Sequence, residues 1–182
     1  MVHPASLRCV LALLIVVSLC AGCGSGGSSS KVSAASYVSS VCSAIAPLEH
    51  DVVTRSSALK NTTAKNATEA KKNLQGFLIA VEQDADHALS RIKSAGTPDI
   101  SGGKAVSTTI VRTFTQLRDA MQTAVTKATT LPTNSPTAFQ SSAQALLTSV
   151  GGALNQIDSR GLNNPDVEKE AAKQAACKSL NG

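Results

Sequence analysis

Apolar side chains recur every three and four residues through four long stretches of this chain, and this spacing limits its fold more than any other feature. Such a period places the apolar positions on one face of an α-helix, whereas a half-buried strand requires strict alternation. The four stretches are residues 34–59, 67–95, 106–128 and 136–157. No stretch alternates as a strand would, so the sequence predicts an all-α fold.

Helix-starting residues precede several of these stretches. Asn66 stands three residues before Glu69, in the spacing of a capping box. Ser135-Pro136 and Asn164-Pro165 each combine an N-cap residue with proline at the first helical position. The second of these pairs predicts a short terminal helix over residues 165–180.

Long helices joined by short loops are typical of an antiparallel bundle. We therefore expect four main helices plus a short C-terminal helix. Pro47 lies inside the first helix and lacks an amide donor, which predicts a kink or break near Ala46. Gly151-Gly152 predicts a bend or close crossing in the fourth. The apolar faces are mainly Ala, Val and Leu, and the chain has three Phe, one Tyr and no Trp, so we expect a thin core.

The N-terminus carries the pattern of an export signal. Residues 10–19 form an apolar run behind Arg8, and this run has about half the length that a membrane-spanning helix needs. The run ends in Leu19-Cys20-Ala21-Gly22-Cys23, followed by Gly and Ser residues at 24–30.

These residues resemble the lipobox of bacterial lipoproteins, and the chain is similar in style to small exported lipoproteins of actinobacteria. The resemblance implies cleavage before Cys23, diacylation of Cys23 with chains such as palmitate, and anchoring to the outer face of the cell membrane. Cys20 stands where the family usually has Leu. An ordinary secretory signal cut near Ala21 or Gly22 is the alternative.

The lipoprotein interpretation divides the chain into three segments. Residues 1–22 are the expected signal peptide, and residues 23–33 are the lipidated Cys23 with a flexible Gly/Ser tether. Residues 34–182 are the expected helical bundle domain. Through its lipid anchor the membrane is a predicted partner.

The five cysteines then leave a single pair in the folded domain. Cys9 and Cys20 are removed with the signal, and Cys23 carries lipid, so Cys42 and Cys177 remain. An exported protein meets an oxidising compartment, and neither cysteine has a CxxC partner. We expect a disulfide between Cys42 and Cys177 that ties the first helix to the last.

The charge distribution excludes nucleic acid as a partner. The chain has 17 Lys and Arg against 12 Asp and Glu. Arg8 is the single charged side chain of the signal, so 16 against 12 remain, a formal charge of +4. These positive charges are scattered, and few aromatic rings exist on which bases could stack.

The densest ionisable cluster lies in the second predicted helix and consists of Glu82, Asp84, Asp86 and His87. At helical spacing Asp84 and His87 share one face, while Glu82 and Asp86 share another. The cluster has no HExxH or DxDxDG frame, so we interpret it as a solvated helix face and expect no metal site. His50, between two acidic residues, is likewise interpreted as a surface histidine.

No catalytic motif marks any of the many hydroxyl side chains. The chain lacks a GxSxG elbow and a GxxxxGK phosphate loop, and no SxxK spacing singles out one serine as a nucleophile. We therefore expect a protein that is not an enzyme and needs no cofactor.

Two functions remain open at this stage. The first is a non-catalytic interaction or structural module of the cell envelope, with a protein or lipid partner, and the sequence favours it. The second is a small carrier that binds a lipid or another apolar ligand between its helices. An apolar cavity around Phe77, Phe114 and Phe139 would favour the carrier.

Overall fold

The computed structural model describes residues 30–155 and 164–178, and most of these residues are helical. Six helices occur in this part of the chain: α1 (Ala34–Asn61), α2 (Ala67–Ser94), α3 (Gly103–Ala128), α4 (Pro136–Asn155), α5 (Pro165–Ala171) and α6 (Ala175–Lys178). The predicted all-α class is confirmed. The signal segment and Cys23 lie outside the described residues.

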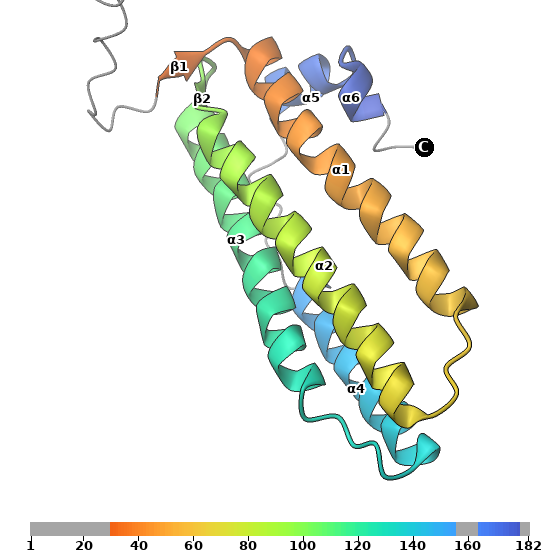
Figure 1. Ribbon diagram of the computed structural model, residues 1–182. Coiled ribbons are helices and arrows are strands. Elements are labelled where there is room, and N and C mark those ends of the chain that lie inside the picture. Colours follow the sequence, from red (N-terminus) through yellow and green to blue (C-terminus); the bar gives the residue numbers. More distant parts are fainter. Residues whose placement is uncertain (1–29, 156–163, 179–182) are drawn as a thin grey trace, which may run out of the picture.

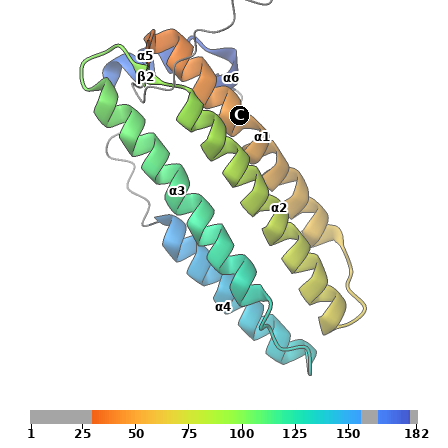
Figure 2. The same ribbon diagram turned by 60° about the vertical axis from the view of Figure 1, so that its left-hand side comes forward.

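The axes of the four long helices are roughly aligned, side by side along the length of the molecule (Figures 1 and 2). α2 packs against both α1 and α3, and α4 packs mainly on α3 with a lighter contact to α2. Extensive backbone contact between α1 and α4 does not occur among the described residues. α5 and α6 pack against α1, as expected for a chain end that folds back on the first helix.

Helix starts follow the capping residues that the sequence indicates. α2 begins at Ala67, directly after Asn66, whose side chain accepts a hydrogen bond from the Glu69 amide at 2.9 Å. The Ser135 hydroxyl accepts from the Ala138 amide at 3.1 Å, just before α4. Asn164 caps α5 by accepting from two amides of its first turn. Each cap satisfies amides that have no partner inside the helix.

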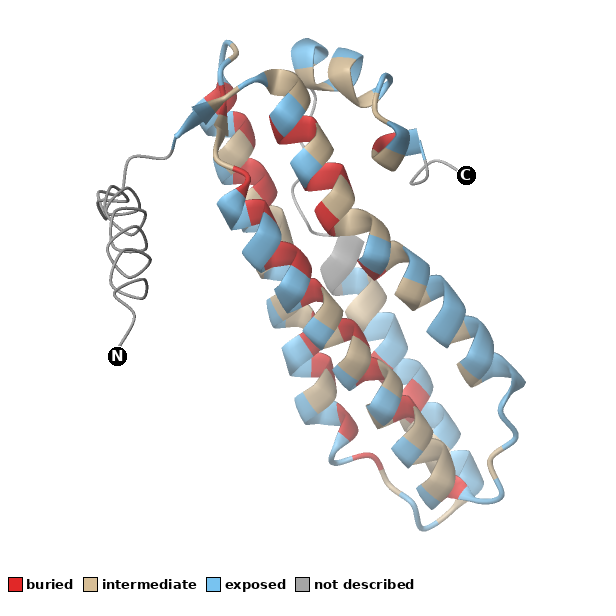
Figure 3. Ribbon diagram, turned by 45° about the horizontal axis from the view of Figure 1, so that its top comes forward, coloured by how far each residue is buried: buried red, intermediate tan, exposed pale blue. Residues whose placement is uncertain are grey.

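The core is divided into three clusters along the length of the helices. The cluster nearest α5 and α6 contains Tyr37, Ile92 and Ile110. The middle cluster contains Leu48, Ala85 and Met121, and the cluster at the other end contains Leu78, Ala128 and Leu146. The buried residues face inward and the outer faces are exposed (Figure 3).

A short parallel pairing lies at the end of the molecule where the described chain begins. β1 (Lys31–Val32) pairs with β2 (Thr97–Pro98). The sequence predicted no strand, because two residues are too few to show an alternating pattern. The pairing holds the start of α1 beside the α2–α3 connection.

The predicted disulfide is present between Cys42 in α1 and Cys177 in α6, with a Cα–Cα distance of 5.1 Å. It joins residues 135 positions apart. Cys42 and Cys177 both belong to the core cluster that includes Tyr37. The bond therefore fixes the C-terminal helices on the N-terminal half of α1.

Two details of the helices differ from the sequence-based expectation. α1 continues through Pro47 without a break. Pro47 is exposed, whereas Ala44 and Leu48 are buried, so core packing holds the helix both before and after the proline. The terminal segment forms two short helices in place of one, separated at residues 172–174. Residues 156–163 and 179–182 lie outside the described part of the chain, so the predicted helix ends at Ile157 and Leu180 are not tested.

Candidate functional site

An apolar groove lies where the four long helices face one another. It has a volume of about 250 Å³, and its accessible lining is entirely apolar. The lining residues are Leu48, Val52, Phe77, Leu78, Val81, Leu117, Met121, Leu147 and Val150.

Helical spacing explains how each helix supplies its part of this lining. Leu48 and Val52 stand four residues apart on α1, and Leu117 and Met121 stand four apart on α3. Leu147, from α4, is 43% exposed, so the groove reaches the surface beside this side chain. Residues at this spacing lie on one face of a helix, and four such faces enclose the groove.

The groove is suited to an apolar ligand or to an apolar part of a larger one. A dry apolar cavity of about 150 Å³ is enough to bind benzene. The groove of about 250 Å³ exceeds that size and offers no hydrogen-bonding group among its exposed lining atoms. A hydrocarbon chain or a ring is therefore the chemistry that this site accommodates.

The three phenylalanines that the sequence singled out do not gather in one cavity. Phe77 lines the groove, but Phe139 lines a separate hollow together with Leu59. Phe114 is packed against two of the core clusters and lines neither. The sequence did not indicate that Leu48 and Leu117 line a groove. Their only signal was their position on the apolar face of a predicted helix.

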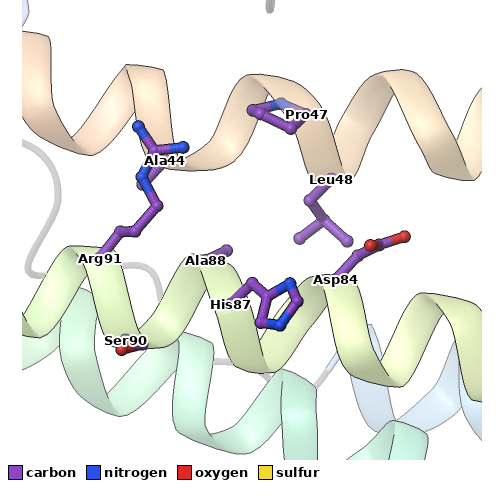
Figure 4. Close-up of a pocket in the computed structure, with 8 residues that line it drawn as sticks. All are labelled: Ala44, Pro47, Leu48, Asp84, His87, Ala88, Ser90 and Arg91. Carbon is purple, nitrogen blue, oxygen red and sulfur yellow. The ribbon is translucent and has the colours of Figure 1, made fainter.

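A second hollow, of about 360 Å³, lies between α1 and α2 and has mixed polarity. Asp84, His87 and Arg91 of α2 line it opposite Pro47 and Leu48 of α1 (Figure 4). One side-chain oxygen of Asp84 is buried and accepts no hydrogen bond from the described residues. The Nε of Arg55 on α1 lies 3.9 Å from that oxygen.

The acidic cluster of α2 is divided between two faces, as the helical spacing predicted for Asp84 and Asp86. Asp84 and His87 line the hollow toward α1, whereas Asp86 lies 3.5 Å from the Arg118 guanidinium of α3. Within the described ranges, no three His, Cys, Asp or Glu side chains gather as a metal site would require. His50 is exposed on α1.

Tyr37 shows how strongly the core cluster near α5 excludes water. Burial raises the pKa of the Tyr37 phenol above 10.0, and the side chain of Ser107 opposes this shift. The hydroxyl of Ser107 donates to the carbonyl of Gly96 at 3.1 Å, and the Tyr37 oxygen itself has no hydrogen-bond partner in the described structure. The phenol therefore stays neutral at physiological pH and contributes packing, not acid–base chemistry.

No known protein family, no curated protein and no solved structure matches this chain. In the part of the chain that the structure describes, no helix has both the length and the hydrophobicity needed to span a bilayer.

Proposed function

We propose that this chain is an exported lipoprotein, anchored through Cys23 to the outer face of the cell membrane, whose helical domain binds an apolar molecule. The observation that carries the ligand part is the apolar groove lined by α1, α2, α3 and α4. The domain acts by binding and not by catalysis.

The anchor rests on the N-terminal sequence. An apolar signal-like run precedes Leu19-Cys20-Ala21-Gly22-Cys23, and a Gly/Ser tether follows. The first paired residue of the domain is Lys31, eight positions after Cys23. A flexible tether of this length spans about 15 Å, so the domain would stay near the membrane surface. Two acyl chains give a durable attachment, whereas one chain gives a marginal one.

We further propose that the four long helices act as one antiparallel bundle around the groove. The middle core cluster supports this arrangement because it includes residues of all four helices, among them Leu48, Val81, Met121 and Val150. The groove lies at this same level, since these four residues also line it.

The groove makes an apolar ligand the preferred partner over a docking protein. The sequence alone favoured an interaction or structural module of the cell envelope. Such a module uses a contiguous apolar or charged patch on its surface. The large apolar side chains that are most exposed in the described ranges, Val53, Ile79 and Leu147, belong to three different helices. An apolar ligand in the groove is the function that the geometry supports best.

Replacing Cys23 by Ala tests the anchor. We expect the wild-type protein to incorporate labelled palmitate in its host and the Cys23→Ala variant to incorporate none, because the thiol is the acylated atom. Cys20→Ala is the matched control and should still be labelled, since Cys20 would leave with the signal peptide. Labelled acyl chains on Cys23→Ala would contradict the proposal, whether or not the variant stays in the membrane fraction.

Filling the groove tests the ligand-binding function. Val52 lines the groove, whereas its neighbour Val53 is 59% exposed and does not. We expect Val52→Phe to weaken the binding of the apolar fluorophore 1-N-phenylnaphthylamine by about tenfold, equivalent to about 1.4 kcal/mol. Val53→Phe adds the same ring at the adjacent position and should leave the affinity unchanged.

The readout is a fluorescence titration, with circular dichroism to confirm that both variants stay folded. Equal affinities for wild type, Val52→Phe and Val53→Phe would show that the fluorophore does not occupy the groove. An absence of saturable binding by the wild type would remove the support for a carrier and favour the docking module.

A further inference from the structure

The hollow between α1 and α2 combines three polar side chains with an apolar floor. His87 follows Asp84 by three residues, and Arg91 follows His87 by four, so the three side chains lie along one face of α2. Opposite them, Ala44 and Leu48 of α1 are 2% and 7% exposed. The site therefore offers both charge and an apolar surface within about 360 Å³, a volume in the range of small-molecule sites.

Asp84 presents a carboxylate to this hollow. Its Oδ2 atom is buried and lies 3.9 Å from the Nε of Arg55, so the side chain meets the hollow through its other oxygen, Oδ1. No side chain of the described residues donates a hydrogen bond to Oδ1. A ligand hydroxyl that enters the hollow would therefore donate to Oδ1.

Arg91 brings hydrogen-bond donors and a positive charge to the same hollow. No hydrogen bond or ion pair holds its guanidinium within the described part of the chain. In Figure 4, Arg91 and Asp84 occupy opposite ends of the hollow, and the His87 ring lies between them. A planar guanidinium binds phosphate or carboxylate oxygens through two parallel hydrogen bonds.

The charges of the site select among possible ligands. Arg91 and Asp84 line the hollow, and Arg55 of α1 is paired with Asp84. Two positive side chains and one negative one give these three residues a net charge of +1. An ammonium group beside Asp84 would also approach Arg55 and be repelled by it. A hydroxyl group donates to the carboxylate without adding positive charge. The best complement is thus an anion with hydroxyl groups at its other end.

The separation of the two ends sets the length of this ligand. Asp84 and Arg91 are seven residues apart on α2, which is about 10 Å along the helix axis. A hydroxyl and an anionic group on one carbon atom would be too close together to meet both residues. The ligand needs a chain of several atoms, and the apolar floor at Ala44 and Leu48 would contact that chain.

From these observations we propose that the α1–α2 hollow binds a polyol phosphate of the glycerol phosphate class, with the phosphate at Arg91 and a hydroxyl donating to Asp84. The same chemistry occurs in a free polyol phosphate and in the headgroup of a glycerol-bearing anionic lipid. This proposal does not depend on the apolar groove, which is a separate site.

The test uses the mature, isotope-labelled protein from its host in non-ionic maltoside micelles. We expect sn-glycerol 3-phosphate to shift the amide signals of residues 44–48 and 84–91 in a saturable way. Inorganic phosphate alone, or glycerol alone, should bind at least about tenfold more weakly because each meets one end of the hollow.

Two variants assign the ends of the ligand. Arg91→Gln should weaken the binding of sn-glycerol 3-phosphate by about tenfold to a hundredfold, the effect of one charged hydrogen-bonded contact. Lys93→Gln removes the same charge from an exposed residue that does not line the hollow, and it should change the affinity little. Asp84→Ala should abolish the advantage of sn-glycerol 3-phosphate over inorganic phosphate. Since it removes an unpartnered acceptor, we expect this variant to stay folded.

Short-chain lipids distinguish the two sources of the ligand. Dihexanoyl phosphatidylglycerol should shift the same amide signals if the ligand is a lipid headgroup, and dihexanoyl phosphatidylcholine should not. Binding of sn-glycerol 3-phosphate without binding of phosphatidylglycerol would support a free polyol phosphate. Equal losses in Arg91→Gln and Lys93→Gln, equal shifts with the two lipids, or no saturable shift with any probe would overturn the proposal. The fluorophore affinity of the groove should be unchanged by Arg91→Gln, so the two proposals can fail independently.

Discussion

Breaking the Cys42–Cys177 disulfide is expected to lower the free energy of unfolding by about 4 to 5 kcal/mol. The bond joins residues 135 positions apart, and a cross-link over so long a loop strongly reduces the entropy of the unfolded chain. The folded state also depends on it, because α5 and α6 are short helices that pack chiefly on α1. We therefore expect amides of residues 165–178 to exchange faster with solvent once the bond is absent.

Urea denaturation of the wild type and of the double variant Cys42→Ala/Cys177→Ala measures this loss. Adding a reductant to the wild type should reproduce most of the effect, while adding it to the double variant should change nothing. A double variant that unfolds at the same urea concentration as the oxidised wild type would refute the expectation.

Gly103→Ala is expected to destabilise the protein by about 3 kcal/mol, near the upper end of the usual cost of overpacking. A Cβ atom at Gly103 would lie 1.9 Å from the carbonyl oxygen of Pro98. This oxygen already accepts a hydrogen bond from Ile100, and Pro98 is among the most deeply buried residues. The backbone of the α2–α3 connection would have to move, and β2 would move with it.

Gly76→Ala is the matched control for this substitution. Gly76 lies within α2, and a Cβ atom there would meet nothing within 4 Å. We expect this variant to be stabilised by up to about 1 kcal/mol, because alanine favours a helix over glycine. Thermal unfolding of both variants gives the comparison, and a Gly103→Ala protein as stable as the wild type would show that the connection adapts freely.

The helices themselves were largely predictable from local patterns. Apolar spacing predicted α2 over residues 67–95, and the structure has Ala67–Ser94. Asn66, Ser135 and Asn164 were recognisable as caps because their side chains satisfy amides only two or three residues away. The Cys42–Cys177 pairing followed from counting the thiols left after the proposed lipidation of Cys23.

The candidate sites were much less predictable. Asp84 and His87 were expected to share a face, but nothing local indicated that this face borders α1, or that Arg91 completes the lining of a hollow there. The divided terminal helix was equally hidden, because the position of α6 depends on where Cys177 meets α1.

The amino-acid sequence by itself determined the helical class, the helix starts and the cysteines available for pairing, because these depend on neighbours a few residues away. The packing of the helices decided that Leu48 and Leu117 face one groove, that Asp84 keeps a buried oxygen without a donor, and that Gly103 touches Pro98. A helical period specifies which residues face inward. It does not specify which helix they meet, because that depends on the distances and angles at which side chains of separate helices interlock.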